Sequence, residues 1–197
     1  MKRLLYLQIY KLTYKLILLG YYIIMANFAL EIFDDESPKC MFYTVMVEGE
    51  ELSETDLFFK RFFEDSQYKS EAMELATFLS SVIGIKRGAL NDFFREEDEA
   101  HALPPPLRTQ IEEVDFGRDF PLRLYCLRLS QSCLILFNGG EKTSQSAQDG
   151  DTSISFRQAK EFAKKILDAM HQKQIKLCAE ERTVLDYYTS QPYLELF

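Results

Sequence analysis

The sequence lacks the short motifs that mark the commonest cofactor and hydrolase sites. It contains no G-x-x-x-x-G-K-[ST] and no G-x-G-x-x-G, so both glycine-rich cradles for nucleotide phosphates are missing. It also contains no G-x-S-x-G and no H-E-x-x-H, the signatures of two large hydrolase classes. These absences argue against a nucleotide-dependent enzyme and against those two classes of hydrolase, and we expect no cofactor.

Residues that bind metals or attack substrates are scarce as well. The chain has two His and four Cys and no C-x-x-C pair: His101, His171, Cys40, Cys126, Cys133 and Cys178. A zinc site needs about four ligands at short spacing, and no such cluster is seen, so we expect no metal. Cys126 and Cys133 flank an expected strand turn and could face each other, but buried free thiols in a reducing cytosol are the favoured interpretation.

What is present is an ordinary globular composition with an uneven charge. Hydrophobic residues make up 47% of the 197 positions, with sixteen Phe and no Trp, which is enough for the core of one domain. The net charge is −8, yet residues 120–176 hold nine basic and five acidic side chains, whereas 25–119 hold nine basic and twenty-two acidic ones. A basic stretch inside an acidic chain is a candidate contact surface for an anionic partner, although a solvated helix face has the same composition.

The first 24 residues differ from the rest, with four basic side chains and no acid. The uncharged run from Leu16 to Leu30 is shorter than the ~20 apolar residues of a spanning helix, and Lys11 and Lys15 would lie inside a longer one. A small-x-small cleavage site for a signal peptide is missing. We favour Met25 as the true start, with residues 1–24 as an upstream in-frame translation, and expect a cytoplasmic protein. A membrane-surface or signal segment and a structural helix are the alternatives.

The pattern of apolar residues predicts a single α+β domain over residues 25–176 and a tail at 177–197. The last stretch of this tail, the aromatic-rich DYYTSQPYLELF at 186–197, is expected to dock on this domain or on a partner. Expected strands cover 27–33, 40–47, 120–129 and 132–137, and expected helices cover 54–65, 70–83, 89–97 and 156–175. Ser53 with Asp56, and Ser155 with Gln158, resemble capping boxes, and Gly84 is the expected C-cap of the second helix. The four Phe of the first helix are interpreted as core, as are Phe162, Ile166 and Met170 of the last.

Four residues of the second half stand out because they lie in or beside apolar strands and three of them are basic. Alternation puts Arg123 and Tyr125 on one face of their strand and Arg128 on the other, while Lys142 follows the next strand. A charge inside an apolar strand is costly unless it is paired or faces water. These arginines are therefore expected to line an open face or to pair with the acidic half of the chain. The carboxylate run at 96–99 is interpreted as a solvated face.

Three segments carry a resemblance to a known family: LRLYCLRLS at 122–130, CLILFNGGEKT at 133–143 and QAKEFAKKI at 158–166. Together they resemble the RelE/ParE superfamily of bacterial toxins, in its phage-derived, HigB-like branch, over about residues 54–173. The resemblance implies a small twisted antiparallel sheet with helices packed on one face. It also implies a toxin of a toxin-antitoxin system, acting as a ribosome-dependent mRNA endonuclease and held by a cognate helix-turn-helix antitoxin.

Carried over by position, Arg128 and Lys142 would be catalytic. The residues expected to bind RNA are Arg123, Tyr125, Arg157, Lys160 and Lys164. The chain departs from the family pattern where Ser132, Cys133 and Leu134 replace an expected Arg-Tyr-like pair, and its net negative charge opposes binding to phosphates. The alternative is a non-catalytic protein-binding module that retains the fold.

Overall fold

The computed structural model describes residues 27–106, 111–142, 152–192 and 195–196. The expectations about residues 1–24 fall outside this part of the chain. Within the described ranges, no helix combines the length and the apolar character needed to cross a membrane.

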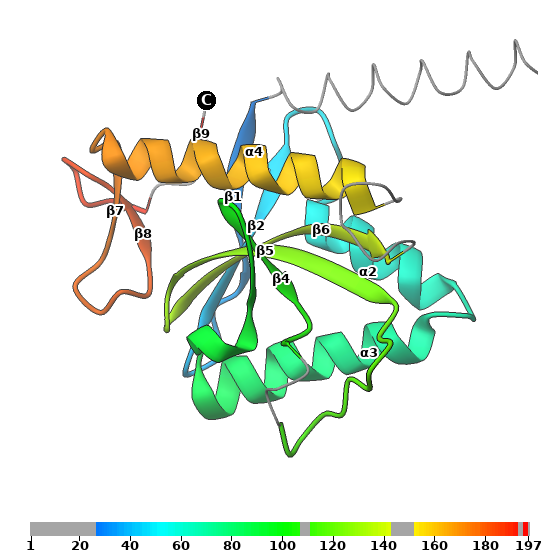
Figure 1. The fold of residues 1–197 in the computed structure, drawn as a ribbon. Coiled ribbons are helices and arrows are strands. Elements are labelled where there is room, and N and C mark those ends of the chain that lie inside the picture. Colours follow the sequence, from blue (N-terminus) through cyan, green and yellow to red (C-terminus); the bar gives the residue numbers. More distant parts are fainter. Residues whose placement is uncertain (1–26, 107–110, 143–151, 193–194, 197) are drawn as a thin grey trace, which may run out of the picture.

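A seven-stranded sheet forms the centre of the molecule, with the order β3-β4-β5-β6-β2-β1-β9 (Figure 1). Its strands are β1 (Phe28–Asp34), β2 (Met41–Val47), β3 (Arg95–Glu97), β4 (Ala100–Leu103), β5 (Leu122–Ser130), β6 (Cys133–Glu141) and β9 (Glu195–Leu196). Five of the neighbouring pairs are antiparallel, but β2 and β6 run parallel. The expected purely antiparallel sheet is therefore wrong at its centre, and the sheet is mixed. The predicted hairpin of β5 and β6 is confirmed, with its turn at Gln131 and Ser132.

The helices are α2 (Glu54–Glu64), α3 (Lys69–Thr77), which continues into the π-helix η1 (Phe78–Arg87), the short η2 (Asn91–Phe93), and α4 (Thr152–His171). The predicted start of α2 is confirmed, because Ser53 Oγ accepts a hydrogen bond from the backbone N–H of Asp56 at 3.1 Å. The predicted capping box of α4 is wrong: the helix begins one turn earlier, and Ser155 Oγ donates to the carbonyl of Gly139 at 3.0 Å.

Two further helix predictions are corrected by the structure. Gly84 lies inside η1, and the helix ends at Gly88, whose φ of +75° suits glycine. The expected helix at 89–97 is only the short η2, after which Arg95–Glu97 forms the edge strand β3. Pairing with β4 outweighs the local helix propensity of that charged stretch.

Helices cover both faces of the sheet, not one as expected. On one face α4 packs Phe162 and Ile166 against Tyr43, Ile135 and Phe137 of the strands. On the other face α2, α3 and η1 contact the alternate strand residues, among them Phe42, Leu124, Leu134 and Leu136. The reason is visible in the strands, because β2 and β6 are apolar on both faces and each face must be removed from water.

The C-terminal residues dock on this domain. A hairpin of β7 (Ile175–Leu177) and β8 (Val184–Asp186) lies at the C-terminal end of α4 (Figure 1). Val184 is buried, and its backbone N–H donates to the hydroxyl of Tyr43 at 3.2 Å. β9 then pairs with β1 at the edge of the sheet. Of the two alternatives for residues 186–197, the described residues support docking within the chain.

Candidate functional site

The structure does not bring the two residues predicted to be catalytic together. Arg128 pairs with Leu134 near the turn of the β5–β6 hairpin, whereas Lys142 follows β6 at the opposite end and donates its backbone N–H to Pro121. Leu134 and Lys142 are eight residues apart along β6, which corresponds to about 27 Å at ~3.4 Å per residue. One scissile phosphate cannot contact both side chains in this arrangement.

The arginines of β5 are held by backbone carbonyls. Arg128 Nε donates to the carbonyl of Ala89 at 2.6 Å, and one guanidinium nitrogen of Arg123 donates to the carbonyl of Leu122 at 2.8 Å. Burial lowers the pKa of both arginines from the usual value. Tyr125 and Arg128 lie on opposite faces of the strand, as strand alternation predicted.

Tyr125 is buried in the core, and Lys160 forms an ion pair at the surface. Tyr125 is 1% exposed and its ring centroid lies 5.6 Å from that of Phe156, so it offers no surface on which an RNA base could stack. Lys160 Nζ lies 2.6 Å from a carboxylate oxygen of Asp98 and 3.6 Å from one of Glu99, and the hydrogen bond to Asp98 raises the pKa of this lysine.

The remaining predicted positions lie on the outside. Arg157 and Lys164 are exposed on α4, and Lys142 is exposed at the end of β6. Asp98 and Glu99, from the carboxylate run, are also largely exposed, which agrees with the solvated face expected there. The predicted residues thus form no single site. Arg123 and Arg128 line two different hollows, and Tyr125 is buried. Lys142 lies at the end of β6, and the remaining basic residues are spread along α4.

Sequence reasoning missed an apolar groove between β1, α2 and α3. It has a volume of about 540 Å³ and is lined by Phe33, Asp34, Asp56, Phe59, Phe63 and Met73, together with neighbouring side chains. Phe33 and Phe63 are each 38% exposed and Met73 is 55% exposed. We call this surface the apolar groove.

The helix α2 shows why these aromatics reach the surface. Phe58 and Phe62 are one turn apart and contact each other in the core, with ring centroids at 4.9 Å. Phe59 and Phe63 are the next residues along the helix, rotated by about 100° from the first pair, and their rings lie 5.2 Å apart. The expectation that all four Phe are core is therefore wrong for Phe63. Two adjacent Phe pairs cover a wider stripe of the helix than one packed face needs. This pattern in the sequence could have indicated that one of the four Phe is exposed.

The lining of the groove carries negative charge only. Asp34 and Asp56 are its ionisable lining residues, and none of the described residues that line it is basic. Local hydrogen bonds fix both carboxylates: Asp34 accepts from the backbone N–H of Glu36 at 2.9 Å, and Asp56 accepts from Ser53 Oγ at 2.6 Å. The groove therefore combines an apolar lining with two carboxylates that local hydrogen bonds hold in position.

Comparison of the chain with protein-family models, with curated proteins and with solved structures finds no match in any of the three.

Proposed function

We propose that this chain is a non-catalytic binding module whose apolar groove holds an amphipathic helix of a protein partner, with basic residues beside its apolar stripe. The observation that carries this proposal is the exposure of Phe33, Phe63 and Met73 on three neighbouring elements around one groove. Large apolar side chains gathered in this way mark interaction surfaces more often than single exposed ones do.

The shape and the energetics of the groove suit a helix. Amphipathic helices dock through apolar anchors spaced at i, i+3 or i+4, and i+7 along one face. Covering the exposed part of Phe63 would remove roughly 60–90 Å² of apolar surface from water, which contributes about 1.5–2 kcal/mol. Phe33 and Met73 add comparable areas, so three anchors offset a large part of the entropy that association costs.

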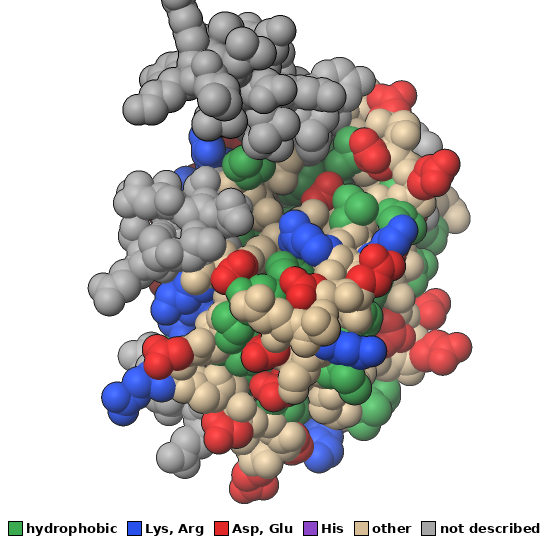
Figure 2. All heavy atoms as spheres, turned by 90° about the vertical axis from the view of Figure 1, so that its right-hand side faces the viewer, with side chains coloured by type: hydrophobic (Ala, Val, Ile, Leu, Met, Phe, Trp, Pro, Cys, Tyr) green, Lys and Arg blue, Asp and Glu red, His purple; other side chains and the backbone are tan. Residues whose placement is uncertain are grey.

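The charge of the surrounding surface selects the partner. Residues 25–119 hold nine basic and twenty-two acidic side chains, and Asp34 and Asp56 lie in the groove itself. Figure 2, which views the molecule from the right of Figure 1, shows acidic side chains spread over the described surface. Such a surface attracts a basic helix and repels a polyanion such as RNA. In a toxin-antitoxin interpretation, the helix would belong to the cognate antitoxin.

A synthetic peptide tests this proposal directly. The probe is a fluorescent helical peptide with Leu at i, i+3, i+4 and i+7 and Lys beside them, compared with a peptide of the same composition in scrambled order. Fluorescence anisotropy should show saturable binding of the patterned peptide only. Phe63→Ser should weaken this binding about tenfold or more, because one anchor is lost. Tyr188→Ser is the matched control, since Tyr188 is 81% exposed and does not line the groove.

Two outcomes would count against the groove as the binding site. The first is equal binding of the patterned and scrambled peptides, which would show attraction by charge alone. The second is unchanged affinity of the Phe63→Ser variant. A third peptide with Glu in place of Lys separates the charge argument from the apolar one, and it should bind more weakly than the basic peptide.

Cleavage of translating mRNA is the second candidate function, and one hollow favours it. Arg128 shares a hollow of about 620 Å³ with His101, whose Nδ1 accepts the backbone N–H of Arg128 at 3.5 Å. Guanidinium groups stabilise the charge that develops at a cleaved phosphate. Asp92, Glu96 and Glu97 line the same hollow, however, and oppose a phosphate backbone.

Expression in cells distinguishes the two functions. If the chain cleaves mRNA in the hollow of Arg128, its induction should arrest growth, and Arg128→Ala should abolish the arrest while the purified variant remains folded. Lys142→Ala should then leave the arrest in place, because Lys142 does not line this hollow. If the chain is a binding module, growth should be unaffected. Wild-type protein that neither slows growth nor cleaves RNA on ribosomes would remove the toxin interpretation and leave the binding module.

A further inference from the structure

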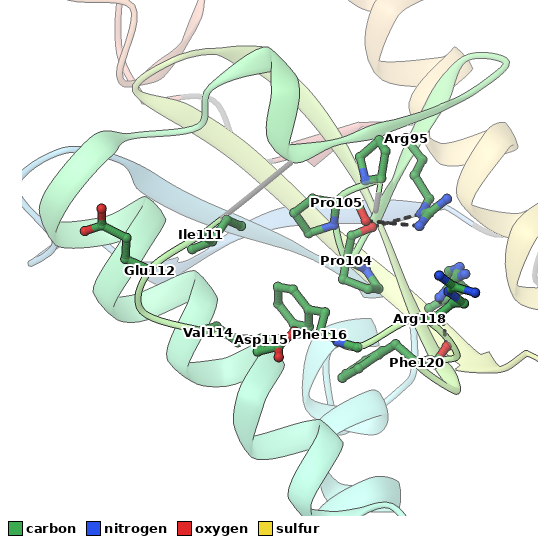
Figure 3. Close-up of a pocket in the computed structure, with 13 residues that line it drawn as sticks. Arg95, Pro104, Pro105, Ile111, Glu112, Val114, Asp115, Phe116, Arg118 and Phe120 are labelled. Atoms are coloured by element: carbon green, nitrogen blue, oxygen red, sulfur yellow. Dashed lines mark hydrogen bonds between the residues drawn. The ribbon is translucent and has the colours of Figure 1, made fainter. Parts of the chain in front are cut away.

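Three arginines from separate parts of the chain meet around a second hollow of about 520 Å³. Arg95 comes from β3, Arg123 from β5, and Arg118 from the loop before β5. The walls between them are apolar and include Phe116, Phe120 and the prolines at 104–106. In Figure 3, Arg95 and Arg118 lie toward the same end of this hollow, and the prolines line its middle. We call it the arginine hollow.

Backbone carbonyls hold two of these guanidinium groups in place. Arg95 donates from Nε to the carbonyl of Pro104 and from a terminal nitrogen to that of Pro105, both at 3.0 Å (Figure 3). Arg123 donates from one terminal nitrogen to Phe120 at 3.2 Å and to Leu122 at 2.8 Å. A guanidinium group has five N–H donors, so each keeps donors that these carbonyls do not use.

The positive charges in the hollow are incompletely balanced. Across the described ranges, neither Arg95 nor Arg123 has a carboxylate oxygen within ion-pair distance. Burial lowers the pKa of Arg123, and the like charge of Arg95 lowers it further. Glu97 acts on both arginines only over a longer distance.

Two carboxylates also line the hollow. Glu112 lies at the end opposite to the arginines, whereas Asp115 lies beside Phe116 and accepts the backbone N–H of Gly117 at 3.0 Å (Figure 3). Half-buried charges without a close partner are costly, and an anion bound between them would relieve this cost. The arginine hollow therefore differs from the apolar groove, whose ionisable lining residues are both acidic.

We propose that the arginine hollow binds a compact oxyanion, a carboxylate or a phosphate, carried on an aromatic body. Planar guanidinium groups fit the two oxygens of such an anion in a bidentate manner. Phe116 and Phe120 line the hollow and contact each other edge to face, with ring centroids at 5.1 Å. Phe120 is buried and Phe116 is half-buried, so an aromatic ring in the hollow would pack mainly against Phe116. This site lies at the β3–β5 side of the sheet and is independent of the apolar groove.

A purely structural role for these arginines is the competing explanation, because Arg95 and Arg123 tie loops to the sheet. Arg118 separates the two explanations. It is exposed and makes no hydrogen bond to the described residues, so its removal should leave the fold intact. Binding that depends on Arg118 cannot be attributed to loop tethering.

Titration of the full chain with small probes tests the site. The probes are benzoate, phenyl phosphate, inorganic phosphate and the neutral benzyl alcohol, followed by amide chemical shifts in ¹H–¹⁵N NMR spectra. We expect saturable shifts at Phe116, Arg118 and Phe120 with benzoate or phenyl phosphate, and whichever binds more tightly identifies the anion. Benzyl alcohol should not saturate, and inorganic phosphate should bind more weakly than phenyl phosphate.

Variants complete the test. Arg118→Ala should weaken binding about tenfold at an unchanged melting temperature, which is the size expected for one charge-assisted contact. Arg123→Lys keeps the charge but loses the planar fork, and it should also weaken binding. Lys69→Ala, an exposed lysine on α3, is the matched control and should bind as the wild type does. The proposal is overturned if neither aromatic anion saturates at millimolar concentration, if benzyl alcohol binds equally, or if Arg118→Ala binds like the wild type.

Discussion

Replacing Ile166 by Asp probes the packing of α4 on the sheet. Ile166 is 0% exposed and belongs to the core between α4 and the strands. Losing its apolar side chain removes about 1.5–3 kcal/mol of transfer free energy. A carboxylate at this position would lie among apolar core side chains, and burial can raise its pKa by about 3–5 units. At pH 7 this costs about 4 kcal/mol, because the buried carboxyl takes up a proton once its pKa approaches 7. The sum approaches the typical stability of a whole domain, about 5–15 kcal/mol.

Milder substitutions make the effect measurable. Ile166→Val should lower the free energy of unfolding by about 0.5–1.5 kcal/mol and Ile166→Ala by about 2–5 kcal/mol. Urea denaturation followed by circular dichroism gives these values, provided that the slope with urea is unchanged. Lys164→Asp is the matched control, because Lys164 is exposed on the same helix, and it should change the free energy by no more than about 0.5 kcal/mol.

The pH dependence of Ile166→Asp supplies a second check. The folded-state pKa of the new carboxyl should be raised, so the folded state binds its proton more readily than the unfolded state does. Its stability should then increase as the pH falls from 7 towards 5. An Ile166→Asp variant that unfolds within 0.5 kcal/mol of the wild type at pH 7 would refute the packing of this face.

Three further predictions concern single positions. Burial lowers the pKa of His101, so the unfolded chain binds a proton on this residue more readily than the folded chain does. The stability of the fold should therefore decrease as the pH falls below about 6.5. His101→Gln should reduce the difference in melting temperature between pH 7.5 and pH 5. Ser53→Ala should cost about 1 kcal/mol in urea denaturation, because α2 loses its N-cap, whereas Ser53→Asn should not. A Cβ at Gly139 would lie 1.9 Å from the carbonyl oxygen of Arg123, so Gly139→Ala should lower the free energy of unfolding by about 3 kcal/mol or more. Gly49 is the control, because nothing lies within 4 Å of a Cβ there and only its φ of +85° disfavours alanine. Gly49→Ala should lower the free energy of unfolding by only about 1 kcal/mol.

Several elements follow from local sequence patterns. The β5–β6 hairpin has apolar strands on either side of a short polar turn, and its pairing is formed by neighbours in the chain. Ser53 accepts one of the unpaired N–H groups at the start of α2, that of Asp56, through a contact three residues away. The buried stripe of α4 at Phe162 and Ile166 follows from the helical period. These features were predicted correctly because each depends on residues close together in the sequence.

Other features depend on contacts between distant segments, and local patterns misplace them. Gly84 looks like a helix C-cap, but a Cβ there would lie 2.5 Å from Ser37 Oγ, so close packing with a distant turn is what requires glycine. Arg95–Glu97 has the composition of a helix and becomes a strand because β4 offers its edge. The parallel pairing of β2 with β6 joins segments about ninety residues apart, which no local period specifies.

The candidate sites likewise depend partly on local sequence and partly on contacts between distant segments. The sequence by itself determined which residue types were available: an acidic first half, a surplus of Phe in α2, and arginines in β5. Only the tertiary structure decided that Phe63 and Met73 share a groove, that Arg95 and Arg118 join Arg123, and that Tyr125 is buried beneath α4. The physical reason is that burial and electrostatic environment are properties of all the neighbours of a side chain, and most of those neighbours come from elsewhere in the chain.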